Sequence, residues 1–317
     1  MNSSLSSGAA WAGRPVKKLR HAVEYGGARL ALAACDRLDP RRAFFVADRL
    51  ADAWFLIDRR RRRTAVSNII ASGVETDPRR AFALARASFR HMGRVIVESL
   101  KAGDVLADEA GRRSAVEMQI HPGAMEALAA PGRGVIVISG HIGNWEIAAR
   151  MLSFIKPVVG VTRPMNNPLV ERLVRDRKPW GRFTLTPKHD ANAARFLQTL
   201  AGGNILALLA DQHAPDMKHM IPFFGRPAAT HGSAALLHLI TGAPLCFGYC
   251  LRSGTMKFRL IALEPIVVKR TGSRKDDVET ILTRLTAELE KAIRVAPDQY
   301  LWAHRRWRDQ PAKPASS

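Results

Sequence analysis

The sequence has 317 residues, of which 47% are hydrophobic and 24% are charged, and both proportions are ordinary for a globular protein. This length is enough for one large α/β domain or two small ones. Three scattered cysteines exclude a disulfide framework and fit a reducing compartment. The net charge of +21 at pH 7 is unusual, and it indicates a polyanionic surface or an acidic partner: nucleic acid, an anionic membrane or an acidic carrier protein.

The N-terminal third is predicted to be helical. Residues 1–15 are small and polar and are expected to form a disordered lead-in, without the apolar block of a signal peptide. Residues 16–36 form a basic amphipathic stretch that two glycines interrupt, and residues 42–58 carry apolar side chains at helical spacing. No window approaches the roughly 20 apolar residues that a spanning helix needs. Residues 16–110 are therefore predicted to form a helical, membrane-associating N-terminal region.

Five consecutive arginines, Arg59 to Arg63, follow the second of these stretches. Such a run is compatible with a solvated helix face or with a nucleic-acid patch. Its place directly after an amphipathic helix that carries aromatic residues favours contact with anionic lipid headgroups.

Residues 111–308 are predicted to form an α/β core, followed by a polar tail at 309–317. Short runs of β-branched and apolar residues, bounded by glycine or proline, are typical of strands buried on both faces of a parallel sheet. They lie at residues 135–138, 157–161 and 205–209. The expected fold class is thus α/β, with a mostly parallel central sheet flanked by helices.

The loop after the first of these strands holds the strongest candidate for chemistry. The carboxyl ends of parallel strands are where α/β proteins bind ligands, and this loop contains His141, Gly143 and Asn144. Asn144 is expected to cap a helix whose first turn contains Glu146. A carboxylate that orients an imidazole is the base half of a nucleophilic triad, and no serine or cysteine beside the pair offers a nucleophile. The base is therefore expected to activate a hydroxyl of the substrate.

The sequence Gly-His-Ile-Gly-Asn-Trp-Glu at residues 140–146 resembles the active-site motif of the bacterial lipid A late acyltransferases, within the lysophospholipid acyltransferase superfamily. The resemblance implies that His141 is a general base and that Glu146 holds and charge-balances it. The backbone N–H groups of Gly143 and Asn144 are expected to stabilise an oxyanion. The resemblance extends from about Arg59 to Trp307.

Further blocks resemble this family in the same order. Arg163 precedes an Asn-Pro helix start, and it is expected to bind a phosphate or carboxylate or else to pair with Glu146 or Glu171. Asp211 and Gln212 follow a buried strand, and they either position the acceptor or hold the loops around the cleft.

The segment Phe224-Gly225-Arg226 matches a Phe-Phe-Gly-x-Pro block. Its aromatics suit an acyl chain and Arg226 suits a phosphate, although core packing is also compatible. The block at residues 300–307, Tyr-Leu-Trp-Ala-His-Arg-Arg-Trp, is compatible with headgroup contacts or with docking against the core.

The resemblance implies an O-acyltransferase that moves a fatty acyl group from an acyl carrier protein or CoA thioester to a hydroxyl of a lipid acceptor. A lipid A precursor is the leading acceptor, and another glycolipid or a phosphoinositide mannoside is the alternative. No metal or cofactor is required, and we expect a monotopic protein on the cytoplasmic face of the inner membrane. A nucleic-acid-binding protein explains the charge, but no reading motif is present. A zinc hydrolase using His141, His213, His219 and His231 lacks the usual metal spacings.

Overall fold

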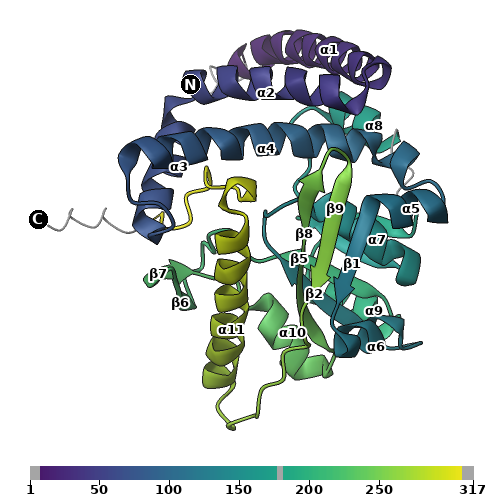
Figure 1. Ribbon diagram of the computed structural model, residues 1–317, viewed down its shortest axis with the longest axis vertical. Helices are drawn as coiled ribbons and strands as arrows, with labels where there is room; N and C mark the ends of the chain where they lie inside the picture. The colour runs from purple at the N-terminus through teal and green to yellow at the C-terminus, as the bar shows by residue number, and fades with distance from the viewer. Residues whose placement is uncertain (1–7, 177–180, 309–317) are drawn as a thin grey trace, which may run out of the picture.

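A computed structural model describes residues 8–176 and 181–308 (Figure 1). Its helices are α1 (Gly8–Arg37), α2 (Pro40–Ile57), α3 (Arg59–Ser72), α4 (Pro78–Val105), α5 (Glu109–Ala115), α6 (Pro122–Ala129), α7 (Trp145–Ile155), α8 (Pro168–Asp176), α9 (Ala193–Ala201), α10 (Ser233–Thr241) and α11 (Arg274–Val295), with a short 3-10 helix η1 (Pro297–Gln299). Its strands are β1 (Val116–Ile120), β2 (Val135–Ser139), β3 (Val158–Thr162), β4 (Phe183–Pro187), β5 (Ile205–Leu209), β6 (Met220–Phe223), β7 (Arg226–Ala229), β8 (Leu245–Gly254) and β9 (Lys257–Ala262).

Within the described residues, seven strands form one sheet in the order β1-β9-β8-β2-β5-β3-β4. Every neighbouring pair is parallel except β8 and β9, which form an antiparallel hairpin. The expected α/β fold with a mostly parallel sheet is confirmed. Strand β2 lies beside β5 with Ser139 opposite Leu209, so the loops that follow these two strands leave the sheet side by side. This adjacency brings together residues that are far apart in the sequence.

The sheet is covered on both faces, which explains why β2 is apolar throughout. Val135 faces α6 and α7, in a cluster that includes Leu128 and Leu152. Its neighbours Ile136 and Ile138 face the opposite side and pack in the larger core with α10 and α11. Successive side chains of a strand point to opposite faces, so a strand buried on both needs no polar alternation.

The N-terminal helices pack over one end of this core, with α4 lying between α2 and the sheet (Figure 1). Carboxylates on α2 hold arginines on α4 in forked contacts. Asp52 accepts hydrogen bonds from Arg86 and Arg90 at 2.6–2.8 Å, and Asp48 accepts two from Arg94 at 2.6 and 2.8 Å. The arginines lower the pKa of Asp52 far below its usual range, because their hydrogen bonds stabilise the carboxylate.

Helix α1 begins at Gly8, within the segment predicted as a disordered lead-in, and continues through Gly26 and Gly27. Residues 1–7 and the predicted tail at 309–317 lie outside the described residues. None of the helices found in the described parts of the chain is both long and apolar enough to cross a bilayer.

Candidate active site

The loop between β2 and α7 is fixed by its own sequence. The side-chain oxygen of Asn144 accepts hydrogen bonds from the N–H groups of Glu146 and Ile147, both at 3.1 Å, and so caps α7 as predicted. Gly143 has φ +57°, and a Cβ atom there would lie 2.0 Å from the carbonyl oxygen of Cys250. Only glycine fits this position, because both its backbone angle and the space around it exclude a side chain.

His141 is held by Asp211, which follows β5. The ring Nδ1 lies 2.8 Å from one carboxylate oxygen of Asp211, and the backbone N–H of His141 donates to the other at 2.8 Å. One buried carboxylate therefore orients both the ring and the backbone of the histidine. The sequence predicts an orienting role for Glu146 and leaves the role of Asp211 open; the structure places Asp211 in contact with the Nδ1 atom.

Electrostatics supports a basic imidazole in this position. Burial disfavours the charged ring of His141, but the adjacent Asp211 carboxylate outweighs burial and raises the histidine pKa. Burial likewise favours a protonated Asp211, yet the interactions with His141 lower the pKa of this carboxyl group. The pair therefore favours imidazolium beside carboxylate, which is the state that a general base reaches after it takes a proton.

The second ring nitrogen of His141 faces the opposite way. The side-chain amide nitrogen of Gln212 lies 3.5 Å from Nε2, and 16% of the His141 side chain is exposed. The indole of Trp145 lies edge-on to the imidazole, with 4.9 Å between ring centroids. The structure thus brings Asp211 and Gln212 to His141, one residue to each ring nitrogen.

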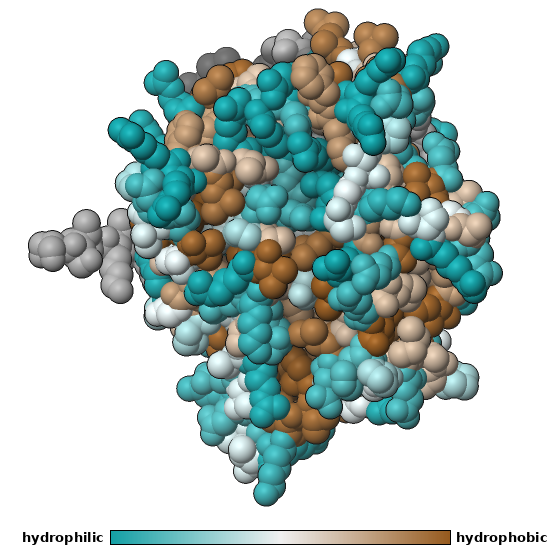
Figure 2. All heavy atoms as spheres, in the orientation of Figure 1, coloured by the Kyte–Doolittle hydropathy of each residue, from teal (hydrophilic) through white to brown (hydrophobic). Residues whose placement is uncertain are grey.

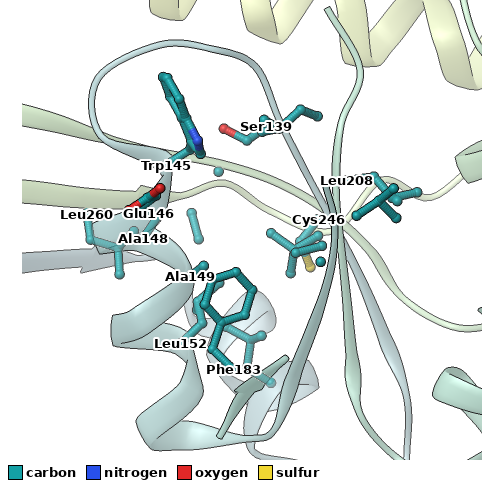
Figure 3. Close-up of a pocket in the computed structure, with 18 of the residues that line it drawn as sticks. Ser139, Trp145, Glu146, Ala148, Ala149, Leu152, Phe183, Leu208, Cys246 and Leu260 are labelled. Carbon is teal, nitrogen blue, oxygen red and sulfur yellow. The ribbon is translucent and has the colours of Figure 1, made fainter. Parts of the chain in front are cut away.

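Glu146 lies in the first turn of α7 and lines a cavity between this helix and the sheet. Figure 3 shows its carboxylate near the indole of Trp145 and the hydroxyl of Ser139, at the end of the cavity away from Phe183 and Leu152. Ser139 therefore lines this cavity beneath the histidine loop.

The cavity is predominantly apolar and offers about 990 Å³ of space not filled by atoms, including the part open to solvent. Small residues form much of its wall, among them Gly160, Ala207 and Cys246, and Leu185 of β4 also lines it. Figure 3 shows Phe183, from the same strand, beside Ala149 and Leu152 of α7. A narrow apolar space beside a polar end is suited to a chain of methylene groups that ends in a reactive carbonyl.

The backbone N–H groups of Gly143 and Asn144, which were expected to stabilise an oxyanion, both donate to carbonyl groups of the protein in this structure. The Gly143 N–H donates to the carbonyl of Gln299 at 2.9 Å, and the Asn144 N–H donates to the carbonyl of Cys250 at 2.7 Å. Both donors are engaged by backbone acceptors in the protein, so their role is to hold the loop.

Arg163 follows the carboxyl end of β3 and is exposed. Strand β5 lies between β2 and β3, so Arg163 emerges at the same edge of the sheet as His141, two strands away. The neighbouring Thr162 lines the cavity. Glu171, in the first turn of α8, accepts a hydrogen bond from the backbone N–H of Met165, which connects this helix to the loop after β3.

Phe224 and Gly225 form the turn of the β6–β7 hairpin, and Arg226 is the first residue of β7. Phe224 is buried, and its backbone N–H donates to Glu290 at 2.7 Å. The guanidinium of Arg226 lies 4.9 Å from the ring centroid of Trp307. In this structure the aromatic and the arginine are both used in packing, the alternative that the sequence analysis had left open.

The C-terminal block docks against the histidine loop. The Leu301 N–H donates to the carbonyl of His141 at 3.0 Å, and the His304 ring accepts from the N–H of His213 at 3.1 Å. Arg306 is buried and donates to the carbonyl of Gln212 at 3.3 Å. Burial and the nearby Asp211 raise the pKa of Tyr300, which keeps its hydroxyl neutral. For these residues, docking is the role that the structure shows.

Comparison with known proteins agrees with the fold and the motif. Residues 17–309 match the model of the bacterial lipid A biosynthesis acyltransferase family. The chain belongs to this family. It is 29% identical over 186 residues to the lipid A biosynthesis lauroyltransferase of Escherichia coli (strain K12), and 26% identical over 187 residues to the palmitoleoyltransferase of the same strain. A lipid A biosynthesis acyltransferase of Shigella flexneri is also 26% identical over 187 residues.

These alignments cover 56–58% of this chain and 58–59% of each relative. The matched part therefore spans less than two thirds of the curated relatives.

The sequence alone does not give the role of Asp211, and it does not indicate the residues of α4 and β8 that contact the histidine loop. Asp211 was recognised as a candidate without a role, since only the adjacency of β2 and β5 shows which side chain it meets. The residues behind the loop, on α4 and β8, carried no signal at all. The four histidines of the zinc alternative give no metal site: over residues 8–176 and 181–308, no group of three or more His, Cys, Asp or Glu side chains is placed to hold an ion.

Proposed function

We propose that the protein is an O-acyltransferase, which moves a fatty acyl group from a thioester to a hydroxyl of a lipid A precursor. The observation that carries the proposal is the His141 imidazole, held through Nδ1 by Asp211 at 2.8 Å, in a loop whose flanking residues Ser139 and Glu146 line an apolar cavity. Membership of the lipid A biosynthesis acyltransferase family supports the same reaction.

In the proposed reaction, Nε2 of His141 takes the proton of the acceptor hydroxyl while its oxygen attacks the thioester carbonyl. The tetrahedral intermediate then collapses, the carbon–sulfur bond breaks, and the imidazolium returns its proton to the leaving thiolate. Asp211 stabilises the imidazolium and fixes the tautomer that leaves Nε2 free to accept. General-base assistance of this kind contributes roughly 10²–10⁴-fold in rate.

Glu146 is proposed to act from the polar end of the cavity. Its place in the first turn of α7, where it lines the cavity together with Trp145 and Ser139, supports this proposal. There it balances the positive charge that develops on His141 and orients the acceptor hydroxyl. The two carboxylates thus have different proposed roles: Asp211 holds Nδ1 of His141, whereas Glu146 lines the cavity.

The cavity is proposed to hold the acyl chain. Its walls are mainly apolar, and burial of each methylene group contributes about 0.8 kcal/mol. A chain that enters along α7 places its carbonyl near Glu146 and the histidine loop. Arg163, at the same edge of the sheet, is proposed to bind a phosphate or carboxylate of the donor or acceptor, since its guanidinium forms forked contacts with such groups.

The donor is proposed to be an acyl carrier protein or acyl-CoA, because both are anionic and the chain carries a net charge of +21. The acceptor requires access to a membrane. Helix α2 exposes Phe45, Leu50 and Trp54, and hydrophobic side chains lie among hydrophilic ones over the N-terminal helices (Figure 2). These helices and the arginines that follow are proposed to hold a monotopic protein on the cytoplasmic face of the inner membrane.

The experiment is a lipid mass spectrum of a strain that lacks the gene, with the gene restored as wild type or as His141→Ala. We expect one lipid A species to lose a single acyl group on deletion and to regain it only with the wild-type protein. An unchanged lipid A profile together with loss of an acyl group from another lipid would redirect the acceptor. Restoration by His141→Ala would contradict the proposed mechanism.

A further inference from the structure

Three side chains from outside the motif, His91, Glu98 and Arg252, contact the histidine loop or the residues that hold it, and His91 and Glu98 are buried. His91 on α4 lies with Nε2 at 3.1 Å from the carbonyl oxygen of Gly143. Arg252 on β8 lies with one guanidinium nitrogen at 2.8 Å from Nδ1 of the same imidazole. Glu98, which also lies on α4, is fully buried and pairs with Arg252 through both carboxylate oxygens.

The hydrogen-bond chemistry of this cluster allows one arrangement. A guanidinium only donates, so Nδ1 of His91 must accept from Arg252, and the ring proton must reside on Nε2. The Nε2–H group then donates to the Gly143 carbonyl. Burial and the charge of Arg252 lower the pKa of His91 well below its usual value, so the ring stays neutral.

Glu98 connects the same cluster to the residue that caps α7. One of its carboxylate oxygens accepts from the side-chain amide of Asn144 at 2.9 Å. The oxygen of the same amide caps α7, so both the nitrogen and the oxygen of the Asn144 side chain are hydrogen-bonded. The side chain of Gln299 forms two hydrogen bonds with the backbone of Arg252, at 2.8 and 3.0 Å. The backbone carbonyl of Gln299 accepts a hydrogen bond from the Gly143 N–H.

We propose that His91, Glu98 and Arg252 are positioning residues for the base, and that they act by fixing the peptide at Gly143 and Asn144. His141 lies two residues before this peptide and takes its place against Asp211 through the same short loop. The inference rests on the proposed function, because it concerns the placement of the proposed general base.

The magnitude of the effect follows from geometry. A misplacement of about 1 Å in a catalytic group can cost about 10²-fold in rate, even when the mutation lies away from the chemistry. A residue that served only global stability would change the melting temperature without changing the rate of the folded protein.

The test compares His91→Phe with His91→Gln. Phenylalanine keeps a flat ring but removes both hydrogen bonds, whereas glutamine keeps an amide N–H that reaches toward the Gly143 carbonyl. We expect His91→Phe to lower kcat by about 10-fold or more with little change in KM for donor or acceptor, and His91→Gln to recover part of the loss.

A second readout follows His141 without turnover. NMR titration of the ring signal, assigned by its absence in His141→Ala, should show a raised pKa in the wild type, because Asp211 stabilises the imidazolium. In His91→Phe this pKa should move, because a displaced loop changes the contact between His141 and Asp211.

The matched control is Arg90→Met, on the same helix. It breaks the ion pair with Asp52, at 2.6 Å, and touches no part of the histidine loop. We expect this variant to lose thermal stability while its kcat and the His141 titration stay at wild-type values. A folded His91→Phe protein that matched Arg90→Met in both readouts would overturn the proposal.

If His91→Phe does not fold, a second variant tests the same proposal. Arg252→Lys keeps a positive charge near Glu98 but cannot donate to Glu98 and His91 in the same forked geometry. The same loss of kcat and shift in titration are expected, and wild-type values would overturn the inference. Absence of acyl transfer by the wild-type protein would count against the proposed function alone, because the NMR titration does not depend on it.

Discussion

His141 and Asp211 stand 70 positions apart in the sequence and meet because β2 and β5 are parallel neighbours. The carboxylate accepts from the backbone N–H of His141 with one oxygen and contacts the ring with the other. Two contacts from one buried group restrict both the position and the rotation of the imidazole. The sequence identifies both residues as candidates but not their contact, because no local sequence pattern determines the order of strands in the sheet.

Substitution of Asp211 by asparagine tests which carboxylate controls the base. Asp211 raises the pKa of His141, so the acid limb of the kcat/KM profile should lie above the usual histidine pKa of about 6.5 in the wild type. Loss of the carboxylate should move this limb below 6.5, because burial then acts unopposed, and should lower kcat by roughly 10²–10⁴-fold.

Glu146→Gln is the comparison, measured over the same pH range with the same donor and acceptor. We expect it to lower kcat while the acid limb stays closer to its wild-type position. A limb that moved with Glu146→Gln and not with Asp211→Asn would reverse the two assignments.

At the scale of elements, the sequence predicted those parts whose local chemistry determines their structure. The apolar run of β2 and the cap at Asn144 were both correct. On α4, the apolar Phe82 and Ile96 are exposed, whereas His91 and Glu98 are buried. Polar side chains on a helix normally indicate its solvent face, and here they are buried because each finds a partner on another element.

Strand β4 and the β6–β7 hairpin were not predicted either. Strand β4 is short, ends at a proline and has a mostly exposed pattern, so it shows neither alternation nor a continuous apolar run. The hairpin contains prolines at Pro222 and Pro227, which reduce the signal for a strand. Both elements owe their conformation to the sheet and the helices beside them.

The tight approach of the histidine loop to β8 predicts a severe effect of Gly143→Ala. The new Cβ would meet the Cys250 carbonyl at 2.0 Å, in addition to the cost of a positive φ. The matched control is Gly73→Ala, because Gly73 has φ +69° and nothing within 4 Å of an added Cβ.

We expect Gly73→Ala to cost about 1–2 kcal/mol, and Gly143→Ala to cost clearly more and to abolish transfer. Denaturant unfolding of both variants measures the difference. Equal losses of unfolding free energy would contradict the close contact.

The cavity beside α7 predicts that Cys246 influences the length of the acyl chain. Cys246 is buried on β8, and its side chain lines the cavity (Figure 3). In Cys246→Phe a ring fills part of this space, so transfer from long-chain donors should fall more than transfer from short-chain donors. Product mass spectrometry with donors of several lengths measures the shift. Retention of a short-chain activity is the internal control for folding, and an unchanged preference would contradict the acyl assignment.

For the whole molecule, the arrangement of charge predicts how the protein meets a membrane. Arg59, Arg60 and Arg63 are exposed on α3, whereas Arg61 pairs with Asp58 at 2.9 Å and Arg62 donates to the carbonyls at the end of α2. Each exposed basic residue near an anionic surface contributes about 1 kcal/mol. The three free arginines and the apolar face of α2 lie on neighbouring helices.

Replacing Arg59, Arg60 and Arg63 by glutamine should weaken binding to anionic vesicles by about 3 kcal/mol at low salt, and less at high salt because of screening. The matched control replaces Lys269, Arg274 and Lys275, exposed basic residues before and at the beginning of α11, and removes the same charge. Vesicle sedimentation measures both. Equal loss in the two variants would show that only net charge matters and would contradict the proposed binding face.

The central claim is that His141 is the base for acyl transfer, and one measurement tests it most directly. Purified wild-type protein, His141→Ala and the control His189→Ala, at an exposed histidine, are incubated with an acyl thioester and a lipid A precursor. Mass spectrometry should show one added acyl group with the wild type and with His189→Ala, and none above background with a folded His141→Ala protein. Transfer by His141→Ala at a near wild-type rate would contradict the account.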